Sequence, residues 1–416
     1  MTTDSHDVSR RTFLQQSTGA MMGLAFVPSL AAIGSARLGA PLGVAVIGVG
    51  RQGRALLGEL QKMNNVQIVA MCDLDDRRLN AAARRAPGAK SYADHRELLD
   101  KHPEAKAIFV STPTHLHREI AVHALQAGRH VYCESPLAST IDDARAIVLA
   151  ARTSGTKFFA GLQGRTNPIY KLAYSFFRTG VIANPVIFRG QNHRKISLRI
   201  PANDPARDRA LNWPLDPEVS LGLPGEWGTQ QFDVIHWYAD RYPVKVRGAG
   251  DIRLWNDGRE VADTIDCEFT FDDGMRFMYD ATLANSYEGE YEQFCGSMGT
   301  IKLAWTFGWL FKEADAPTQG WEVYANRQQF HRDEGITLIA DATQLAAQNR
   351  LKDGIGLPNP PLYYAVEDFI NAIANDQPVT VSAEEGLRAT AVAIAAAKAV
   401  RENTEVEIDP AMFRLA

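Results

Sequence analysis

The first half of the chain alternates short apolar runs with stretches of helical periodicity. The apolar runs predict buried strands at 42–47, 66–72, 106–111, 130–133 and 157–161. A helical pattern follows the first run, and another, over 119–128, follows the third. Strands that alternate with helices predict an α/β domain with a doubly wound parallel sheet, over residues 41–162. The ligand of such a sheet is expected beyond the carboxyl ends of its strands.

The pattern changes after about residue 165, where strands follow one another with few helices between them. Strands are predicted at 185–192, 244–254, 263–271, 275–283 and 291–297. Period-two alternation places Ile265, Cys267, Phe269 and Phe271 on one face of the third of these strands. We therefore predict a second α/β domain, residues 163–360, with a large open, mostly antiparallel sheet. Because sheets of this type often pair face to face, we expect a homo-oligomer.

The last part of the chain returns to helical periodicity. The stretches 360–376 and 382–403 are amphipathic and rich in alanine, which predicts two helices. We expect residues 361–416 to pack back against the first domain.

The N-terminus has the pattern of an export signal. Arg10 and Arg11 form a twin-arginine motif, an apolar stretch rich in Gly and Ala follows, and Gly34-Ser35-Ala36 is a small-residue cleavage site. The stretch is too short and too rich in Gly and Ala for a stable membrane span. Residues 1–36 are therefore predicted to be a signal peptide read by the twin-arginine export machinery, with the mature protein in the periplasm or otherwise exported. A mobile N-terminal helix is the alternative.

Composition narrows the class of partner. The chain has 416 residues, of which 45% are hydrophobic and 22% charged, a balance typical of globular proteins. Its formal net charge of -5 argues against nucleic acid as the main partner, because phosphate binding needs a basic surface. The four cysteines show no close-spaced framework, so free thiols are expected, with a disulfide as the alternative. No Cys/His cluster has metal-ligand spacing, and no metal is predicted.

A glycine-rich turn follows the first strand and opens a helix. Gly48, Gly50 and Gly53 form the G-x-G-x-x-G pattern with Arg51 and Gln52 between them. The first glycine permits a tight turn, the second lets the backbone approach a pyrophosphate, and the third lets helix and strand pack closely. The helix N-terminus would face the anion. This loop predicts a dinucleotide-binding (Rossmann) domain.

An acidic residue at the end of the second strand supports this interpretation. Asp73 is placed to accept hydrogen bonds from the ribose hydroxyls and to repel a 2′-phosphate. It favours NAD over NADP, although Arg51, Arg77 and Arg78 leave NADP open. A turn or helix cap is the alternative role for Asp73. Further cofactor contacts are expected from residues that follow the later strands: Ser111, Thr112, Pro113, His115, His117, Glu134 and Gln163.

The chain resembles the Gfo/Idh/MocA family of oxidoreductases. The segments that carry the resemblance are AVIGVGRQG, STPTHLHREIAVHALQAGRHVYCESPLA, GEWGTQQFDVIHWYAD and SAEEGLRATAVAIAAAKAVREN. The resemblance implies an N-terminal Rossmann domain and a C-terminal α/β domain with an open sheet. It also implies an NAD(P)-dependent reaction on sugars, polyols and related compounds.

This chain departs from the family pattern at its catalytic positions. The family typically has Glu-Lys-Pro where this chain has Glu134-Ser135-Pro136. It commonly has an aspartate and, four residues later, a histidine, where this chain has Glu226 and Gln230. Glutamate can do the acid–base work of aspartate, but serine and glutamine do not titrate near neutral pH. The resemblance therefore supports fold and cofactor more firmly than the reaction.

Other residues are candidates for the missing base and for the substrate site. Glu226 and His193 are the leading bases, with Gln230 and Ser135 at catalytic positions; His236 is interpreted as a core histidine. Tyr287 and Tyr291 are alternative acids, although packing roles are equally consistent. Substrate contacts are expected from Arg165, Asn167, Trp213, Trp227 and Tyr291. Ordinary core packing is an alternative for both tryptophans.

Three functions remain open. The leading prediction is an exported oxidoreductase that acts on a sugar, polyol or glycoside and keeps its NAD(P) tightly bound, because no free nicotinamide pool is expected outside the cytoplasm. The second is a redox-neutral glycosidase or lyase that oxidises, eliminates and then reduces. The third is a sugar-binding protein that contains nucleotide without turnover.

Overall fold

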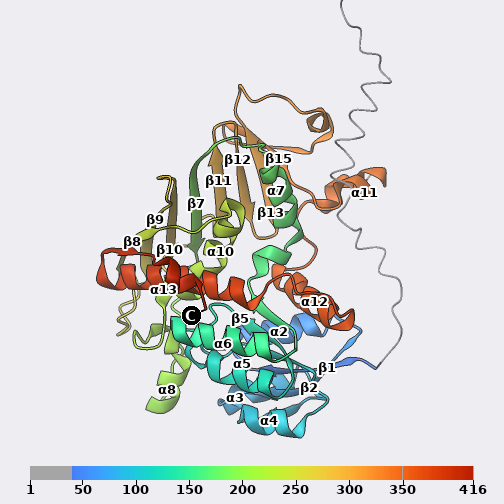
Figure 1. The fold of residues 1–416 in the computed structure, drawn as a ribbon, viewed down its shortest axis with the longest axis vertical. Helices are drawn as coiled ribbons and strands as arrows, with labels where there is room; N and C mark the ends of the chain where they lie inside the picture. The colour runs from blue at the N-terminus through green and yellow to red at the C-terminus, as the bar shows by residue number, and fades with distance from the viewer. Residues whose placement is uncertain (1–39, 349, 416) are drawn as a thin grey trace, which may run out of the picture. The chain divides into compact units, whose positions relative to one another are not determined.

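The computed structural model describes residues 40–348 and 350–415, so the predicted export signal lies outside the described residues. The chain forms two sheets (Figure 1). The first is a six-stranded sheet in the order β3-β2-β1-β4-β5-β6, and all its pairs are parallel. Its strands are β1 (Leu42–Ile47), β2 (Val66–Cys72), β3 (Lys90–Tyr92), β4 (Ala107–Val110), β5 (His130–Glu134) and β6 (Phe158–Gly161). The predicted doubly wound α/β fold is confirmed.

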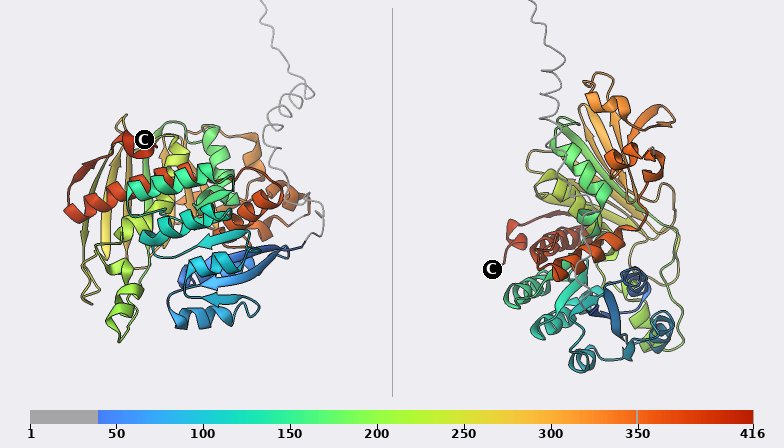
Figure 2. Two further views of the ribbon diagram at one scale, coloured as in Figure 1. Left: turned by 60° about the horizontal axis from the view of Figure 1, so that its bottom comes forward. Right: turned by 90° about the vertical axis from the view of Figure 1, so that its right-hand side faces the viewer.

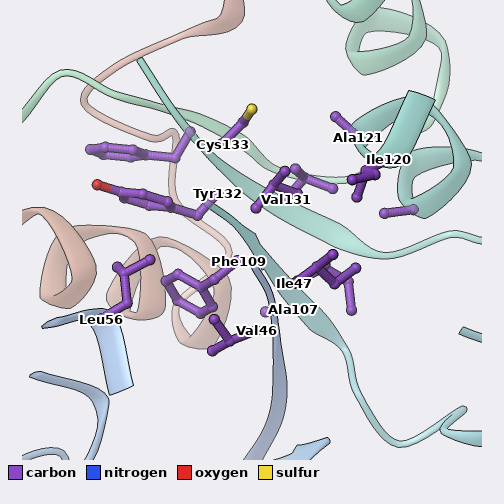
Figure 3. Close-up of a cluster of buried hydrophobic side chains, with 14 of the residues drawn as sticks. Val46, Ile47, Leu56, Ala107, Phe109, Ile120, Ala121, Val131, Tyr132 and Cys133 are labelled. Atoms are coloured by element: carbon purple, nitrogen blue, oxygen red, sulfur yellow. The ribbon is translucent and has the colours of Figure 1, made fainter. Parts of the chain in front are cut away.

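Alternating side chains of these strands supply the first core. Val46, Phe109 and Tyr132 pair across β1, β4 and β5, and all three are fully buried. Figure 3 shows them on the same side as Leu56, whereas Ile47 and Val131 point to the other side. The connecting helices cover both faces of the sheet. They are α2 (Arg51–Leu60), α3 (Asp76–Ala83), α4 (His95–Lys101), α5 (His117–Gln126) and α6 (Ile141–Thr153). A sheet covered on both faces explains why its strands are apolar without alternation.

The second sheet has ten strands in the order β14-β15-β13-β12-β11-β7-β10-β9-β8-β16. Only the β7–β10 pair is parallel among its described pairs, so the predicted mostly antiparallel sheet is confirmed. Its strands are β7 (Pro185–His193), β8 (Lys245–Asp251), β9 (Thr264–Thr270), β10 (Arg276–Thr282), β11 (Glu290–Gly296), β12 (Gly299–Ala304), β13 (Phe307–Lys312), β14 (Arg327–Phe330), β15 (Asp333–Thr337) and β16 (Glu405–Glu407).

The two faces of the second sheet differ. Helices pack on one face, which we call the covered face; they are α7 (Pro168–Arg178), α9 (Gly222–Glu226), α10 (Gly228–Ala239) and α13 (Ala383–Glu402). Figure 2 shows α7 and α13 on the same side of this sheet. On β10, Phe277 and Tyr279 are buried towards this face, whereas Arg276, Met278 and Asp280 are exposed on the opposite, open face.

The C-terminal helices connect the two cores. Helix α12 (Pro361–Ala374) packs on α2, and its Phe369 contacts Phe109 and Tyr132 in the first core. In α13, Leu387 belongs to the first core and Ala396 to the second. Two further helices are α8 (Pro205–Leu211) and α11 (Ala342–Ala347). Across the described part of the chain, no helix is long and apolar enough for a bilayer span. All four cysteines are free thiols.

Candidate active site

The glycine loop has the backbone that its sequence predicts. Gly48 has a φ of +88°, a conformation that favours glycine. At Gly53, a Cβ atom would lie 1.9 Å from the carbonyl oxygen of Gly48, so any side chain there would collide with the turn. At Gly50 the nearest atom to such a Cβ is Nη1 of Arg78, at 3.4 Å, which leaves room above the turn. The loop is therefore shaped for the close approach of a ligand.

Two neighbouring strand ends brace this loop. The backbone N–H of Val49 donates to Oδ2 of Asp73 over 2.9 Å, and the hydroxyl of Ser111 donates to the carbonyl of Gly48 over 2.7 Å. Asp73 also accepts from the N–H of Asp75 over 2.9 Å, so it has the turn-capping role as well. Each carboxylate oxygen accepts more than one hydrogen bond, and Asp73 keeps capacity for ribose hydroxyls.

Glu134 joins the glycine loop to the end of β5. Nε2 of Gln52 donates to its carboxylate over 2.8 Å. Burial raises the pKa of Glu134 to about 7, against the opposing hydrogen bond from Gln52. Two predicted cofactor contacts, Gln52 and Glu134, are thus in direct contact with each other.

The two neutral residues at catalytic positions also contact each other. Nε2 of Gln230 lies 2.9 Å from the hydroxyl of Ser135 and donates over 2.7 Å to the carbonyl of Gly161. Its Oε1 accepts the backbone N–H of Gln163 over 3.0 Å. Gln163 begins a short helix, η3 (Gln163–Thr166), after β6. An amide–hydroxyl pair at these two predicted positions therefore ties α10 to the ends of β5 and β6.

Glu226 is the ionisable group beside this pair. It ends α9, and its Oε2 accepts from the hydroxyl of Thr114 over 2.9 Å. Thr114 opens a short helix, η2 (Thr114–Leu116), after β4, so this contact joins the two domains. Burial raises the pKa of Glu226 to about 7, and the hydrogen bonds from Thr114 and from the N–H of Leu221 oppose the shift. This pKa suits a general acid or base at neutral pH.

The structure corrects the prediction for His193 and Tyr291. His193 ends β7 with its side chain paired to Asp280, which is exposed on the open face. Tyr291 lies opposite Gln191 in the sheet and under the ammonium of Lys302, 4.2 Å from its ring centroid. Both side chains follow the strand alternation away from the covered face, where Glu226 and Gln230 lie. Neither residue is placed to act on a substrate there.

Two predicted substrate contacts have structural roles. Arg165 is buried and paired with Asp233 at 2.9 Å and with Glu385 at 2.5 Å. Asn167 is fully buried, and its Oδ1 accepts the N–H groups of Ile169 and Tyr170 at the start of α7.

His117, predicted to contact the cofactor, is 1% exposed. Its ring nitrogens face the carbonyls of Thr112 and Pro136, at 2.9 and 3.0 Å. Burial lowers the pKa of His117 to about 4, and its hydrogen bonds to the two backbone carbonyls oppose the shift. It holds together the loops that follow β4 and β5, and Pro113 lies in the first of these loops.

A polar group on the covered face was not predicted. Asn192 and Glu290 are opposite each other on β7 and β11, and Nδ2 of Asn192 donates to Glu290 over 3.1 Å. Arg194 lies 3.6 Å from Glu290 and over the ring of Trp227, 5.4 Å from its centroid. Burial raises the pKa of Glu290 to about 7, opposed by the Trp305 indole and by Arg194. The only sign of this group in the sequence is that Asn192 is adjacent to His193 and Glu290 to Tyr291, two residues that were predicted for the site.

Several buried polar atoms in this region have no hydrogen-bond partner among the described residues. They are Oγ1 of Thr112 and Nδ1 of His115 on the Rossmann side, and Oδ1 of Asn192 and Oε1 of Gln231 on the sheet side. Unpaired buried polar atoms are costly. The Rossmann atoms fit a dinucleotide at the strand ends, and the sheet-side acceptors fit a ligand rich in hydroxyl donors.

A possible ligand set for a metal lies elsewhere and was not predicted. His95, Glu119 and His123 place ligand atoms within 4.8 Å of one another on α4 and α5. Nε2 of His95 and Nδ1 of His123 are 2.9 Å apart, and Glu119 also pairs with Arg96. The two rings are joined by a hydrogen bond in this structure. The i,i+4 spacing of Glu119 and His123 was the available sequence signal.

Comparison with known proteins establishes the family. Residues 42–162 match the Gfo/Idh/MocA family model described as an oxidoreductase family with an NAD-binding Rossmann fold. Residues 179–408 match the C-terminal alpha/beta domain of the same oxidoreductase family. The chain belongs to the Gfo/Idh/MocA oxidoreductase family.

Individual relatives cover the chain to different extents. A levoglucosan dehydrogenase of Pseudarthrobacter phenanthrenivorans is 35% identical over 162 residues, which are 39% of this chain and 40% of that protein. The myo-inositol 2-dehydrogenase of Thermotoga maritima is 23% identical over 88% of this chain and 98% of that protein. A solved levoglucosan dehydrogenase in complex with NADH and levoglucosan has a TM-score of 0.70 at 21% identity, over 88% of this chain and 99% of that one. This last likeness shows the fold.

Proposed function

We propose that this protein is an exported NAD(P)-dependent oxidoreductase that acts on a sugar, polyol or glycoside. The observation that carries the proposal is Glu226, a carboxyl group at a family catalytic position whose pKa is raised by burial to about 7. The names of the relatives, which include dehydrogenases of levoglucosan and of inositol, support a polyhydroxylated substrate. NAD is favoured over NADP because Asp73 stands at the ribose position.

In this mechanism Glu226 handles the proton. Bound NAD(P) supplies the hydride acceptor or donor. The Glu226 carboxylate takes the hydroxyl proton of the substrate as the carbon gives up its hydride, and returns the proton in the reverse direction. Gln230 and Ser135 exchange no proton. They hold α10 against the ends of β5 and β6, and so fix the position of the second domain relative to the strand ends of the Rossmann domain.

The sheet side of the site would bind the substrate hydroxyls. Oδ1 of Asn192 and Oε1 of Gln231 are buried acceptors without partners, which substrate O–H groups would satisfy. Arg194 and the ring of Trp227 lie beside them. A planar aromatic ring next to charged and amide groups is suited to a sugar ring, which has an apolar face and a polar edge.

The test is a pair of substitutions at Glu226. Glu226→Gln keeps the size and the hydrogen bond from Thr114 but removes the titrating group. We expect a loss of about 10²- to 10⁴-fold in turnover of levoglucosan or myo-inositol, with NAD binding unchanged. Glu226→Asp should recover part of the rate. Glu260→Gln, at an exposed position of the second domain, is the control. Undiminished turnover by Glu226→Gln would falsify the assignment.

We also propose that the cofactor stays bound after export. The support is the twin-arginine pattern at Arg10 and Arg11, since that route exports folded proteins. Denaturing the purified, dialysed protein should release about one NAD(P) per chain. Protein that is empty and binds no added nucleotide contradicts the oxidoreductase, whereas an empty protein that reloads contradicts only retention.

A redox-neutral glycosidase or lyase is the second candidate. Glu290 favours it, because elimination after oxidation needs a second group to remove a C–H proton, and the pKa of Glu290 is raised by burial to about 7. Product analysis separates the two: an oxidised sugar indicates the first, and a released aglycone or second sugar indicates the second. Stabilisation by sugar without turnover would indicate a nucleotide-containing binding protein.

We propose that the open face of the ten-stranded sheet mediates homo-oligomerisation. Met278 and Phe307 are large apolar residues exposed on this domain, at 37% and 39%. On the open face, charged side chains such as Arg276 and Asp280 alternate with apolar ones. Light scattering after size exclusion should give a mass of two chains or more, and Met278→Glu should lower it. A monomer in the unsubstituted protein would contradict the proposal.

A further inference from the structure

One segment of the second domain reaches the Rossmann domain. Residues 194–221, here called the crossing segment, leave the end of β7 and return at α9. The segment contains α8 and a short helix, η4 (Trp213–Leu215). Figure 1 shows α8 beyond the end of the ten-stranded sheet, level with the Rossmann helices. Neither cofactor binding by the glycine loop nor proton transfer by Glu226 requires so long a connection between β7 and α9.

Its strongest contact is an ion pair at the end of β2. Nε of Arg207, in α8, lies 2.6 Å from Oδ2 of Asp75. Asp75 stands two positions after Asp73, the residue expected at the ribose. The Asp75 side chain is only 9% exposed and that of Arg207 is 28% exposed, so water screens the pair incompletely. Arg207 and hydrogen bonding together lower the pKa of Asp75 despite its burial, so Asp75 stays ionised.

A further contact reaches another strand end. Trp213 packs edge-on against His115, which follows β4, with ring centroids 6.2 Å apart. The crossing segment therefore contacts the loops after β2 and β4, two of the loops that border a dinucleotide in this fold.

The crossing segment is braced from within. Asn212 is buried, its Oδ1 accepts the N–H of Ile200 over 2.7 Å, and its Nδ2 donates to the carbonyl of Ile200 over 3.0 Å. Arg199 lies 3.8 Å from Asp208 and 3.6 Å from Asp257. These bonds join its outward and returning limbs, so α8 is presented to Asp75 by a closed loop and not by two independent strands of chain.

We propose that the crossing segment is a strap that retains the dinucleotide, with Arg207 as the residue that closes it. This rests on the proposed function, because it takes NAD(P) as the ligand. A dinucleotide in this fold would lie beyond the carboxyl ends of the strands, and the segment contacts the loops at two of these ends. Release would therefore require the Arg207–Asp75 pair to open.

The experiment measures cofactor release. Protein loaded with NADH is mixed with excess NAD⁺, and the decay of energy transfer from tryptophan to NADH gives the dissociation rate. We expect Arg207→Ala to accelerate release about tenfold, since affinity changes of this kind appear mainly in the off-rate. Arg207→Lys should fall between it and the unsubstituted protein. Arg209→Ala, on the same helix at an exposed position, should release NADH at the original rate.

The outcomes separate the strap from the proposed function. If Arg207→Ala releases NADH at the original rate, as Arg209→Ala is expected to do, the strap is overturned and the oxidoreductase proposal is unaffected. Equal acceleration by both substitutions also overturns it, because a general loosening of α8 would then explain the result. A protein that binds no NADH at all contradicts the proposed function instead.

Discussion

The glycine loop and the corner around Glu226 lie at neighbouring strand ends but are built differently. The loop is formed by one stretch of chain, and its shape depends on backbone geometry at Gly48 and Gly53. The corner is assembled from five separate segments, after β4, β5 and β6 and in α9 and α10. The loop tolerates no side chain where helix and strand meet, whereas the corner is held by side chains, among them the hydroxyl of Ser135 and the amide of Gln230.

The difference shows where this family scaffold can change. The loop binds the part of the cofactor that is the same in every reaction, so its geometry has no alternative. At the corner, only one group with a pKa near neutrality is needed for a proton transfer. Glu226 supplies such a group, and the Ser135–Gln230 pair is then free to serve as a structural tie.

The largest effect is expected from the loop. Gly53→Val places a side chain where even a Cβ would be 1.9 Å from a carbonyl oxygen. Either the turn or α2 must move, which abolishes nucleotide binding and lowers the free energy of unfolding by about 1–3 kcal/mol. Nucleotide content and a denaturant titration measure the two. Gly50→Ala is the matched control for stability, because its nearest neighbour is a flexible arginine at 3.4 Å. A Gly53→Val protein that still binds NAD would contradict the account of the loop.

The next effect is the pH dependence of the reaction. Because oxidation needs the Glu226 carboxylate, kcat/KM should rise about tenfold per pH unit below about 7 and level off above it. Reduction needs the protonated form, so its rate should fall above the same pH. Initial rates at pH 5 to 9 measure both. The residual activity of Glu226→Gln should show no such step, and persistence of the step would move the titrating role to Glu134 or Glu290.

A smaller effect separates the two neutral residues. Gln230→Ala leaves the Gln163 N–H without its partner and the Gly161 carbonyl with only the long, 3.4 Å bond from the Ser135 hydroxyl, which costs about 1–3 kcal/mol of stability. Ser135→Ala removes one hydrogen-bond partner of Gln230, which keeps its two backbone partners, so a cost below about 1 kcal/mol is expected. Thermal unfolding of both variants measures the difference. Neither change should shift the pH step of kcat/KM. A shift in either variant would show that the pair takes part in proton transfer.

The sequence predicted the glycine loop and most strands, but it could not determine to which face of the second sheet a given side chain points. His193 and Tyr291 were placed at the correct strand ends, yet a strand turns successive side chains to opposite faces. The covered face therefore received their neighbours, Asn192 and Glu290. Burial also could not be predicted for Arg165, whose partners Asp233 and Glu385 come from distant helices. Strands β3, β12 to β15 and β16 were not predicted. The connections before β12 and β13, Ser297-Met298 and Trp305-Thr306, contain none of the Gly, Asn or Pro residues that mark a turn.

The smallest effect concerns Glu292, which lies on the covered face beside Glu290. Burial raises its pKa from 4.5 to about 8, the charge of Glu290 adds to this, and the hydroxyl of Tyr170, which donates over 2.6 Å, opposes it. The native state therefore holds a proton that the unfolded chain loses near 4.5. The stabilisation that Glu292 contributes is fully present below pH 4.5 and is lost as the pH rises towards about 8.

Glu292→Gln keeps the bond from Tyr170 and removes the titration, so its melting temperature should decline less over this window. At pH 8 we expect it to melt about 2–4 °C above the unsubstituted protein, and at pH 4.5 no higher. Scanning calorimetry across this pH range measures the slope, with Glu313→Gln, an exposed position after β13, as the control. If the melting temperatures of Glu292→Gln and Glu313→Gln fall with the same slope as the pH rises, Glu292 is ionised in the native state. The covered face would then hold a second negative charge beside Glu290, and Arg194, which lies 3.6 Å from Glu290, would have to balance both.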